Sequence, residues 1–504
     1  MLSDPQVEFA AWLDQLRRNA ALQQWRYLVL LSGERSWSRT LCAACPELVG
    51  PATVWCSDHV PAGARGLVAT QAFQLLGTET ASVVYDAWAG LHPNALAVLA
   101  GTIRAGGVLV LLTPALDAWS RFDDPDYVRI EVPGFPVEPE RRFLRYLAGQ
   151  LGADPRVIRV APRQPLPLLA AVAGEHVPIP RVVGNTDCVT DEQAQAVAAM
   201  EHVVDGHRNR PLVLCSDRGR GKTAALGIAC ARLLRRGISP ILVTAPALRN
   251  VGPLFERAAA LLPGAQCEDG QLSWRDGCIR FCAPDYLLEH HPRARLLMVD
   301  EAAALPSPML SAMLDHYHRL IFTTTVHGYE GSGRGFALRF QPELSRRMPH
   351  WRYMALFAPV RWAAGDPLEA SLNRLLLLQA DAAPDHRLHG DGALRQQIEI
   401  LDRNQLATNR ALLRQIFGLL MMAHYRTTPD DLRLLLDGPN MRLAVMFEDK
   451  LVAAVVLFAC EGELEPALSE AVREGRRRPR GHLLPQVLLA QTGCAALLDV
   501  PGWR

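Results

Sequence analysis

The stretch SDRGRGKTAA, Ser216–Ala225, decides which fold and which chemistry we expect of this chain. It continues an apolar run, PLVLCS, that is typical of a buried strand, and it leads into KTAALGIACARLLRRG, an expected helix closed by Gly237. A glycine-rich turn between a strand and a helix can place backbone N–H groups around a phosphate at the helix N-terminus. The stretch therefore predicts a phosphate-binding loop.

This loop departs at one position from the usual pattern GxxxxGK[ST], because Ser216 stands where the first glycine is expected. Gly219 and Gly221 keep the tight turn, and we expect Lys222 to contact the β- and γ-phosphates and Thr223 to bind Mg²⁺. The first position only begins the turn and tolerates a small residue, so we predict a working nucleotide site. Its predicted nucleotide-binding residues are Ser216, Asp217, Arg218, Gly219, Arg220, Gly221, Lys222, Thr223, Ala224 and Ala225.

Acidic and polar residues elsewhere support the nucleotide site. The run RLLMVDEAAALP places Asp300 and Glu301 at the carboxyl end of an expected strand. Asp300 can hold the water shell of Mg²⁺ there, and Glu301 can orient or deprotonate the attacking water. Gln193, in the segment TDEQAQA, is a candidate for reading an adenine edge with its amide; a plain surface position is the alternative.

Two segments further along the chain complete this prediction. PVRWAAGDPLE carries Arg361, a candidate for stabilising transferred phosphate charge; a structural ion pair with Asp366 or Glu369 is the alternative. TTTVHGYEGSGRGF, Thr323–Phe336, follows another expected strand, and its hydroxyls and glycines suit γ-phosphate sensing or a loop coupled to the substrate. Together these features predict a helicase-type ATPase, with Lys222, Asp300, Glu301 and Arg361 as catalytic residues and Thr223 and Asp300 at the metal.

Length and composition limit the class of protein. The 504 residues are too many for one core, and 49% hydrophobic with 21% charged residues fits a globular protein. The chain has 53 Lys and Arg residues and 52 Asp and Glu residues, so its net charge is +1. This overall charge does not indicate a nucleic-acid partner, and binding to a nucleic acid would need a local basic patch. No apolar run long enough for a membrane span and no signal-peptide pattern is found. We expect a cytoplasmic protein without a membrane partner.

Alternating apolar runs and helical stretches predict an α/β, multidomain fold with RecA-like, doubly wound parallel sheets. Residues 1–175, with strand-like YLVLLSG and GGVLVLLTP but no GK[ST], predict a Rossmann-like domain without a phosphate loop. Residues 176–372 predict the helicase-like ATPase domain, and 373–396 a linker. Residues 397–504 begin with the helix NRALLRQIFGLLMMAHY and continue with a strand pair, RLAVMFEDKLVAAVVLFACEG.

Longer motifs resemble those of the bacterial tRNA(Met) cytidine acetyltransferase family. They are SDRGRGKT, MVDEAAALP, TTTVHGYEGSGRGF, PVRWAAGDPLE, AHYRTTPDDLRLLLDGPN (Ala423–Asn440) and RRRPRGHLLPQ (Arg476–Gln486). The N-terminal stretch VVYDAWAGLHPNALAVLAGTIRAGGVLVLLTP is similar to the first domain of that family. The resemblance covers essentially the whole chain.

The resemblance implies a helicase-like ATPase fused to a GNAT acetyltransferase, which acetylates the N4 amine of the wobble cytidine of elongator tRNA(Met) with acetyl-CoA and ATP. It assigns ATP contacts to Gln193, Ser216–Ala225 and Arg361, and the Mg²⁺ and hydrolysis roles to Asp300 and Glu301. Residues 397–504 would be the GNAT domain. The glycine-rich loop that holds the acetyl-CoA pyrophosphate in the family is not found after His482, so we expect a truncated GNAT domain and no acetyl transfer by this polypeptide alone.

The tRNA partner points to a basic cluster near the C-terminus. Arg476, Arg477, Arg478 and Arg480 are predicted to bind tRNA phosphates; a solvated loop balanced by nearby glutamates is the alternative. His482 is a candidate general base for acetyl transfer, with a structural role as the alternative. Two other classes stay open: an ATP-dependent RNA remodeller without transferase activity, and a scaffold, which the intact Lys222 and Asp300 disfavour. No obligate protein partner is implied.

Overall fold

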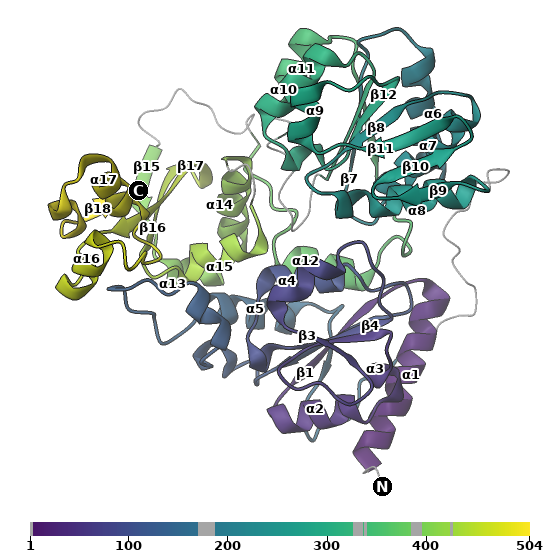
Figure 1. The fold of residues 1–504 in the computed structure, drawn as a ribbon. Coiled ribbons are helices and arrows are strands. Elements are labelled where there is room, and N and C mark those ends of the chain that lie inside the picture. The colour runs from purple at the N-terminus through teal and green to yellow at the C-terminus, as the bar shows by residue number, and fades with distance from the viewer. Residues whose placement is uncertain (1–3, 170–186, 326–335, 337–339, 385–395, 424–426) are drawn as a thin grey trace.

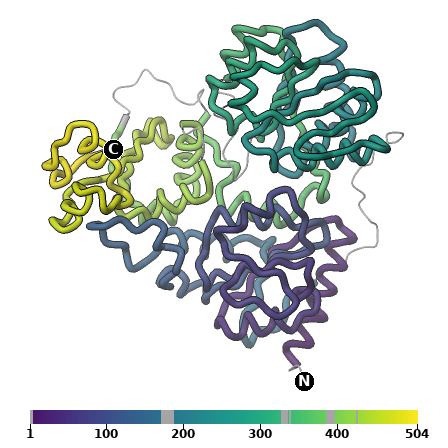
Figure 2. The backbone as a smooth tube through the Cα atoms, viewed as in Figure 1, coloured from purple at the N-terminus to yellow at the C-terminus, as the bar shows by residue number. Residues whose placement is uncertain are grey.

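The computed structural model describes residues 4–169, 187–325, 336, 340–384, 396–423 and 427–504, which form three lobes (Figure 1). The first lobe comprises residues 4–169, the second 187–356 and the third 396–504. The N- and C-terminal ends of the chain lie on different lobes (Figure 2). No helix in these ranges combines the length and the apolar character that crossing a membrane requires.

The first lobe contains a six-stranded parallel sheet in the order β3-β2-β4-β5-β1-β6. Its strands are β1 (Tyr27–Ser32), β2 (Thr53–Cys56), β3 (Arg65–Leu67), β4 (Ser82–Asp86), β5 (Val108–Thr113) and β6 (Ile158–Val160). Leu28 and Leu30 of β1 face one core, and Val29 and Leu31 face the opposite core. Both faces are therefore covered, as a parallel sheet requires. The expected strands YLVLLSG and GGVLVLLTP are confirmed.

Helices cover the two faces of this sheet in separate groups. One face carries α1 (Asp4–Gln23), α2 (Arg35–Ala43) and α3 (Pro46–Val49); the other carries α4 (Pro93–Ala100) and α5 (Arg142–Ala153). The doubly wound α/β fold predicted for this region is confirmed.

The second lobe contains an eight-stranded sheet in the order β14-β7-β13-β12-β8-β11-β10-β9. Its strands are β7 (Leu212–Ser216), β8 (Ile241–Thr244), β9 (Gln266–Glu268), β10 (Gln271–Trp274), β11 (Gly277–Phe281), β12 (Leu296–Val299), β13 (Leu320–Thr325) and β14 (Arg352–Leu356). One face carries α6 (Asp191–Asp205), α7 (Lys222–Arg235) and α8 (Gly252–Leu261); the other carries α9 (Pro284–His290), α10 (Ser307–His316) and α11 (Gln341–Arg347). Because β7 and β13 are parallel neighbours and pair Ser216 with Thr325, their carboxyl ends meet at one edge.

The third lobe is an α+β unit with an antiparallel sheet in the order β15-β16-β17-β18. Its strands are β15 (Gln396–Ile400), β16 (Met441–Glu448), β17 (Leu451–Glu461) and β18 (Gly502–Trp503). Its helices are α13 (Arg403–Thr408), α14 (Arg410–Ala423), α15 (Pro429–Asp437), α16 (Pro466–Arg473) and α17 (Leu483–Thr492). The expected helix and strand pair are confirmed as α14, β16 and β17. The expectation that the region begins with that helix is wrong, because β15 and α13 precede it.

Helix α12 (Pro367–Leu375) packs on the first lobe. Leu368, Leu372 and Leu375 lie in the core that contains Leu28 and Leu30. The boundary predicted after residue 372 therefore falls inside a helix that lies between the lobes (Figure 1).

Helix α15 binds the third lobe to the first. The Asp437 carboxylate accepts hydrogen bonds from the backbone N–H groups of Arg142 (2.8 Å) and Phe143 (2.9 Å), at the N-terminus of α5. The buried Arg433 donates from Nη1 to the Leu91 carbonyl at 3.0 Å. Leucines of α15 also lie in the core of the first lobe, so the cores of the first and third lobes are continuous.

Candidate nucleotide-binding site

The loop between β7 and α7 has the shape of a phosphate cradle. Gly219 and Gly221 take φ values of +77° and +80°, and Gly221 caps the N-terminus of α7. A Cβ at Gly219 would lie 2.6 Å from the ring of Trp362, and one at Gly221 would lie 2.7 Å from Nε2 of Gln193. Glycine is required at both positions, because the backbone is left-handed there and its neighbours are close.

Lys222 reaches the carboxyl edge of the sheet. Its Nζ donates to Oγ1 of Thr325 at 3.0 Å, and the same hydroxyl donates to both carboxylate oxygens of Glu301 at 3.1 Å. Glu301 adopts the left-handed backbone conformation, with φ +49°. A non-glycine residue rarely occupies that region, and such strain gathers at functional sites.

Thr223 meets Asp300 beside this chain of contacts. The Thr223 hydroxyl donates to Oδ2 of Asp300 at 3.0 Å, while Oδ1 accepts hydrogen bonds from the Thr323 hydroxyl and from the backbone N–H of Glu301 at 3.0 Å. Asp300 is fully buried, and burial raises the pKa of its carboxyl above the ordinary value; the Thr323 hydrogen bond, the positive charge of Lys222 and the Thr223 hydrogen bond act against this rise.

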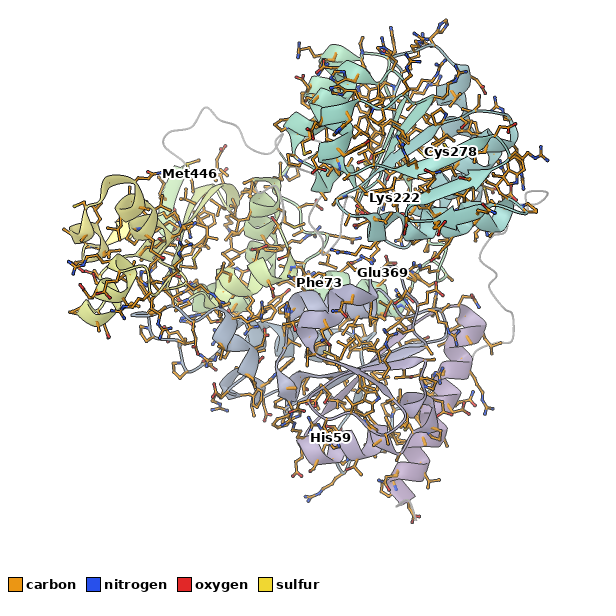
Figure 3. All side chains as sticks on the ribbon, in the orientation of Figure 1. His59, Phe73, Lys222, Cys278, Glu369 and Met446 are labelled. Carbon is orange, nitrogen blue, oxygen red and sulfur yellow. The ribbon has the colours of Figure 1, made fainter. Side chains whose placement is uncertain are left out.

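A cavity of about 210 Å³ opens over the loop. Arg218 to Ala224 line it, together with Glu301 and Thr325. Leu76 and Gly77 of the first lobe form part of its wall. Figure 3 shows Lys222 on the side of the second lobe that is turned toward the first lobe, with Glu369 of α12 between the two. The cavity therefore lies where the two lobes meet.

Four of the predicted nucleotide residues do not line this cavity: Gln193, Ser216, Asp217 and Ala225. Asp217 lines two other hollows next to the loop. Ser216 is buried and its hydroxyl donates to the Asp217 carbonyl at 2.8 Å, while Ala225 is packed in the core. Gln193 supports the loop, because its Nε2 donates to the Gly221 carbonyl at 3.3 Å and its Oε1 accepts from the Val189 N–H at 2.8 Å. Contact between Gln193 and adenine stays a prediction.

Arg361 lines the cavity and is paired across the lobes. Its Nε lies 3.6 Å from Oε1 of Glu79 in the first lobe. The carboxylates weighed as partners in the sequence bind other arginines: Asp366 binds Arg26 and Glu369 binds Arg220. The ion pair of Arg361 with Asp366 or Glu369, weighed as the alternative, is therefore wrong. The role of Arg361 in stabilising transferred phosphate charge stays a prediction.

The C-terminal basic cluster lies on the third lobe, between α16 and α17, and does not line this cavity. Arg476, Arg477 and Arg478 are exposed, and Arg476 is paired with Glu474. Arg480 donates to the Arg129 carbonyl of the first lobe. An RNA role for these four arginines stays a prediction.

The structure describes the surroundings of His482, the candidate general base, but only part of the segment after β13. His482 is buried: its Nδ1 accepts from the Gly462 N–H at 3.0 Å and its Nε2 lies 2.8 Å from the Pro133 carbonyl. Both ring nitrogens are engaged with the backbone, so a structural role holds and a general-base role does not. Of the segment Thr323–Phe336, for which γ-phosphate sensing was expected, residues 326–335 lie outside the described residues.

The donors at the cradle fit Mg²⁺ and a triphosphate. In the described ranges, no three His, Cys, Asp or Glu side chains gather into a metal site. Mg²⁺ does not need such a cage, because it keeps several waters and takes one or two protein oxygens together with phosphate oxygens. The Thr223 hydroxyl and the Asp300 carboxylate supply oxygens of this kind, next to the cationic Lys222.

Several residues of the site were not expected from the sequence. Leu76, Gly77 and Glu79 come from the first lobe, and Arg249 and Asn250 come from the turn after β8. The stretch that contains the first three, LGTET, has no pattern that points to a nucleotide. Only the packing of the first lobe against the second brings Leu76 and Gly77 to the cavity and Glu79 to Arg361.

Family comparisons cover most of the chain. Residues 1–162 match the family described as "tRNA(Met) cytidine acetyltransferase TmcA, N-terminal". Residues 213–379 match the family "RNA cytidine acetyltransferase NAT10/TcmA, helicase domain", and residues 415–504 match the family "GNAT acetyltransferase 2". These three regions correspond to the first lobe, the second lobe with α12, and most of the third lobe.

Similar proteins carry the same family name. The tRNA(Met) cytidine acetyltransferase TmcA of Nitrosococcus halophilus is 43% identical over 93% of this chain, which spans 64% of that relative. The TmcA of Vibrio cholerae is 35% identical over 98% of the chain, which spans 65% of it. The TmcA of Citrobacter koseri is 34% identical, again over 98% of the chain and 67% of the relative. The chain thus spans about two thirds of the length of its relatives, and it belongs to the tRNA(Met) cytidine acetyltransferase TmcA family.

Proposed function

We propose that this chain provides the ATP-hydrolysing part, and at least the beginning of the acetyltransferase part, of an enzyme that acetylates the N4 amine of the wobble cytidine of elongator tRNA(Met) with acetyl-CoA. We place this activity in the cytoplasm. The observation that supports the proposal most is the convergence of Lys222, Thr325 and Glu301 with Thr223 and Asp300 at one cradle, in a chain of this family.

The residues of the cradle have separate roles in this proposal. ATP supplies a phosphoanhydride whose cleavage releases free energy. Lys222 and the backbone N–H groups of the loop hold its phosphates, and Thr223 and Asp300 hold the Mg²⁺ that accompanies it. Glu301, whose carboxylate accepts from Thr325, orients the water that attacks. Arg361 supplies positive charge from the wall of the cavity.

ATP hydrolysis is proposed to move RNA, because acetyl-CoA is already an activated acyl donor. A wobble base stacks in the anticodon loop, and its amine must leave the stack before it can attack a thioester. Unstacking a base costs about a few kcal/mol. Closure of the first and second lobes on a nucleotide would provide this work, since both lobes contribute walls to the cavity.

Incubation of the chain with Mg²⁺, ATP, acetyl-CoA and unmodified elongator tRNA(Met) tests the proposal. Phosphate release is followed directly, and the tRNA is then digested for nucleoside mass spectrometry. We expect ATP hydrolysis that increases when tRNA is present. Formation of N4-acetylcytidine would establish the whole reaction, whereas tRNA-stimulated hydrolysis without it would assign RNA remodelling alone to this chain. Hydrolysis that does not respond to tRNA, or no hydrolysis, would contradict the proposal.

A further inference from the structure

A second hollow, of about 710 Å³, also borders the phosphate loop and shares Arg220 with the nucleotide cavity. It is assembled from parts that are distant in the sequence: the loop itself, helix α12, and helix α14 of the third lobe. Figure 1 shows α12 between the lobes and α14 on the side of the third lobe that is turned toward the other two. Five arginines line the hollow: Arg156, Arg220, Arg374, Arg410 and Arg414.

Three of these arginines are neutralised by carboxylates. Arg156 is bound to Asp154 at 2.8 Å. Arg220 is bound to Glu369 at 2.9 Å. Arg414 is bound to Asp381 at 3.2 Å. Asp217 and Asp366 also line the hollow, and Asp366 is bound to Arg26. Arg374 and Arg410 are the two remaining arginines.

Arg374 and Arg410 have no carboxylate partner among the residues that the structure describes. Their Nε atoms are buried and have no hydrogen-bond acceptor there, and the same is true of Nε of Arg220. The two side chains lie near one hydroxyl, that of Tyr146 in α5: burial raises the pKa of Tyr146, and Arg410 and Arg374 oppose the rise. Arg410 also has a side-chain hydrogen bond with this hydroxyl. Two guanidinium groups without a carboxylate partner in the described ranges therefore come from different helices to one wall.

The chemistry of this wall suits a phosphate group. A guanidinium group presents a planar fork of N–H donors that matches phosphate oxygens, and a buried donor without an acceptor is costly to the fold. The volume of the hollow lies within the range of about 300–1,000 Å³ that is typical of small-molecule sites, so a nucleotide unit of a nucleic acid fits.

We propose that this hollow is a binding site for RNA backbone phosphate, in which Arg374 and Arg410 contact the phosphodiesters of the tRNA substrate. This inference rests on the proposed function, because that function supplies the RNA. Free inorganic phosphate presents the same oxygens to the two guanidinium groups, so the two sources are separated by experiment.

The hollow and the nucleotide cavity share a residue that couples them. Arg220 lines both, and its ion-pair partner Glu369 accepts from Nε1 of Trp362 at 3.0 Å. The Trp362 ring lies against Gly219 of the phosphate loop. RNA bound at Arg374, on the helix that carries Glu369, therefore acts on the loop that binds the nucleotide.

The affinity for elongator tRNA(Met) at several salt concentrations tests this site. Each phosphate contact contributes about 0.7–0.9 to the slope of log K against log[salt]. We expect Arg374→Gln and Arg410→Gln each to reduce the slope by about that amount, and the double variant by about twice as much. Arg236→Gln is the matched control, because Arg236 is a partly exposed arginine of the second lobe that is paired with Asp205; it loses the same charge and should leave the slope unchanged.

The unaltered chain provides a second measurement that does not depend on the folding of variants. Hydrogen exchange should show that tRNA protects the amides of α12 and of the first turn of α14. Binding of tRNA with unchanged slopes and without this protection would overturn the site while leaving the proposed function in place. Failure of the unaltered chain to bind tRNA would overturn both. Protection by inorganic phosphate alone, with unchanged tRNA slopes, would assign the hollow to free phosphate and overturn the RNA assignment.

Discussion

Lys222→Ala is expected to lower the rate of ATP hydrolysis about 10²–10³-fold, which is the usual cost of removing one preorganised hydrogen-bond donor from a reacting group. Lys222 Nζ lies at the carboxyl edge of the sheet, held by Thr325 next to Glu301. Alanine removes the Lys222 charge from the place where phosphate negative charge is expected, although Arg218 and Arg220 remain in the loop. Phosphate release at saturating ATP, with and without tRNA, measures the effect.

The chain offers an unusually well-matched control. Only two of its 53 basic residues are lysines, and the other is Lys450, exposed at the turn between β16 and β17. Lys450→Ala makes the same chemical change away from the cradle and should leave the rate unchanged. Equal rates for the two variants would contradict the role assigned to Lys222.

Asp366→Ala is expected to destabilise the first lobe by about 3–5 kcal/mol, because it leaves a buried arginine without its counter-charge. The Asp366 carboxylate accepts from the backbone N–H of Arg26 at 2.7 Å and from its Nη2 at 2.9 Å, and the two side chains are 0% and 3% exposed. The same carboxylate caps α12 by accepting from the Glu369 N–H at 2.7 Å. The Arg26 guanidinium lies 3.3 Å from the centre of the Trp362 ring, so its environment would change too.

Urea unfolding followed by tryptophan fluorescence measures this loss of stability. Asp14→Ala is the control, since Asp14 pairs with the exposed Arg18 on the surface of α1, and exposed pairs contribute about 0–1 kcal/mol. An unfolding midpoint for Asp366→Ala that matches that of Asp14→Ala would show that the pair does not hold α12 to the first lobe.

Local sequence patterns were sufficient for the central part of the site. The strand–turn–helix pattern around Gly219 and Gly221 and the acidic pair after an apolar strand each depend on neighbouring residues, and the structure has both. Parallel strands end at one edge of a sheet, so Asp300 had to come near the loop once both were assigned to one sheet. That rule of topology made a long-range contact predictable from short-range signals.

Contacts between lobes were not predictable in this way. The partner of Asp366 is Arg26, and that of Arg361 is Glu79; both partners belong to the first lobe. A charged side chain in a sequence does not indicate which distant lobe will face it, so the nearest carboxylates were weighed as partners of Arg361, wrongly. Helix α12 shows the same limit, because its apolar face indicates burial but not the core against which it is buried.

The central claim is that Lys222, Thr223, Asp300 and Glu301 serve one magnesium-bound triphosphate. The most direct test is an experimental structure of the chain with Mg²⁺ and a non-hydrolysable ATP analogue. We predict that the terminal phosphates contact Lys222 and the backbone of Gly219–Thr223. We predict that Mg²⁺ binds the Thr223 hydroxyl and lies next to the Asp300 carboxylate. An analogue bound elsewhere, or a metal away from Thr223 and Asp300, would contradict the account.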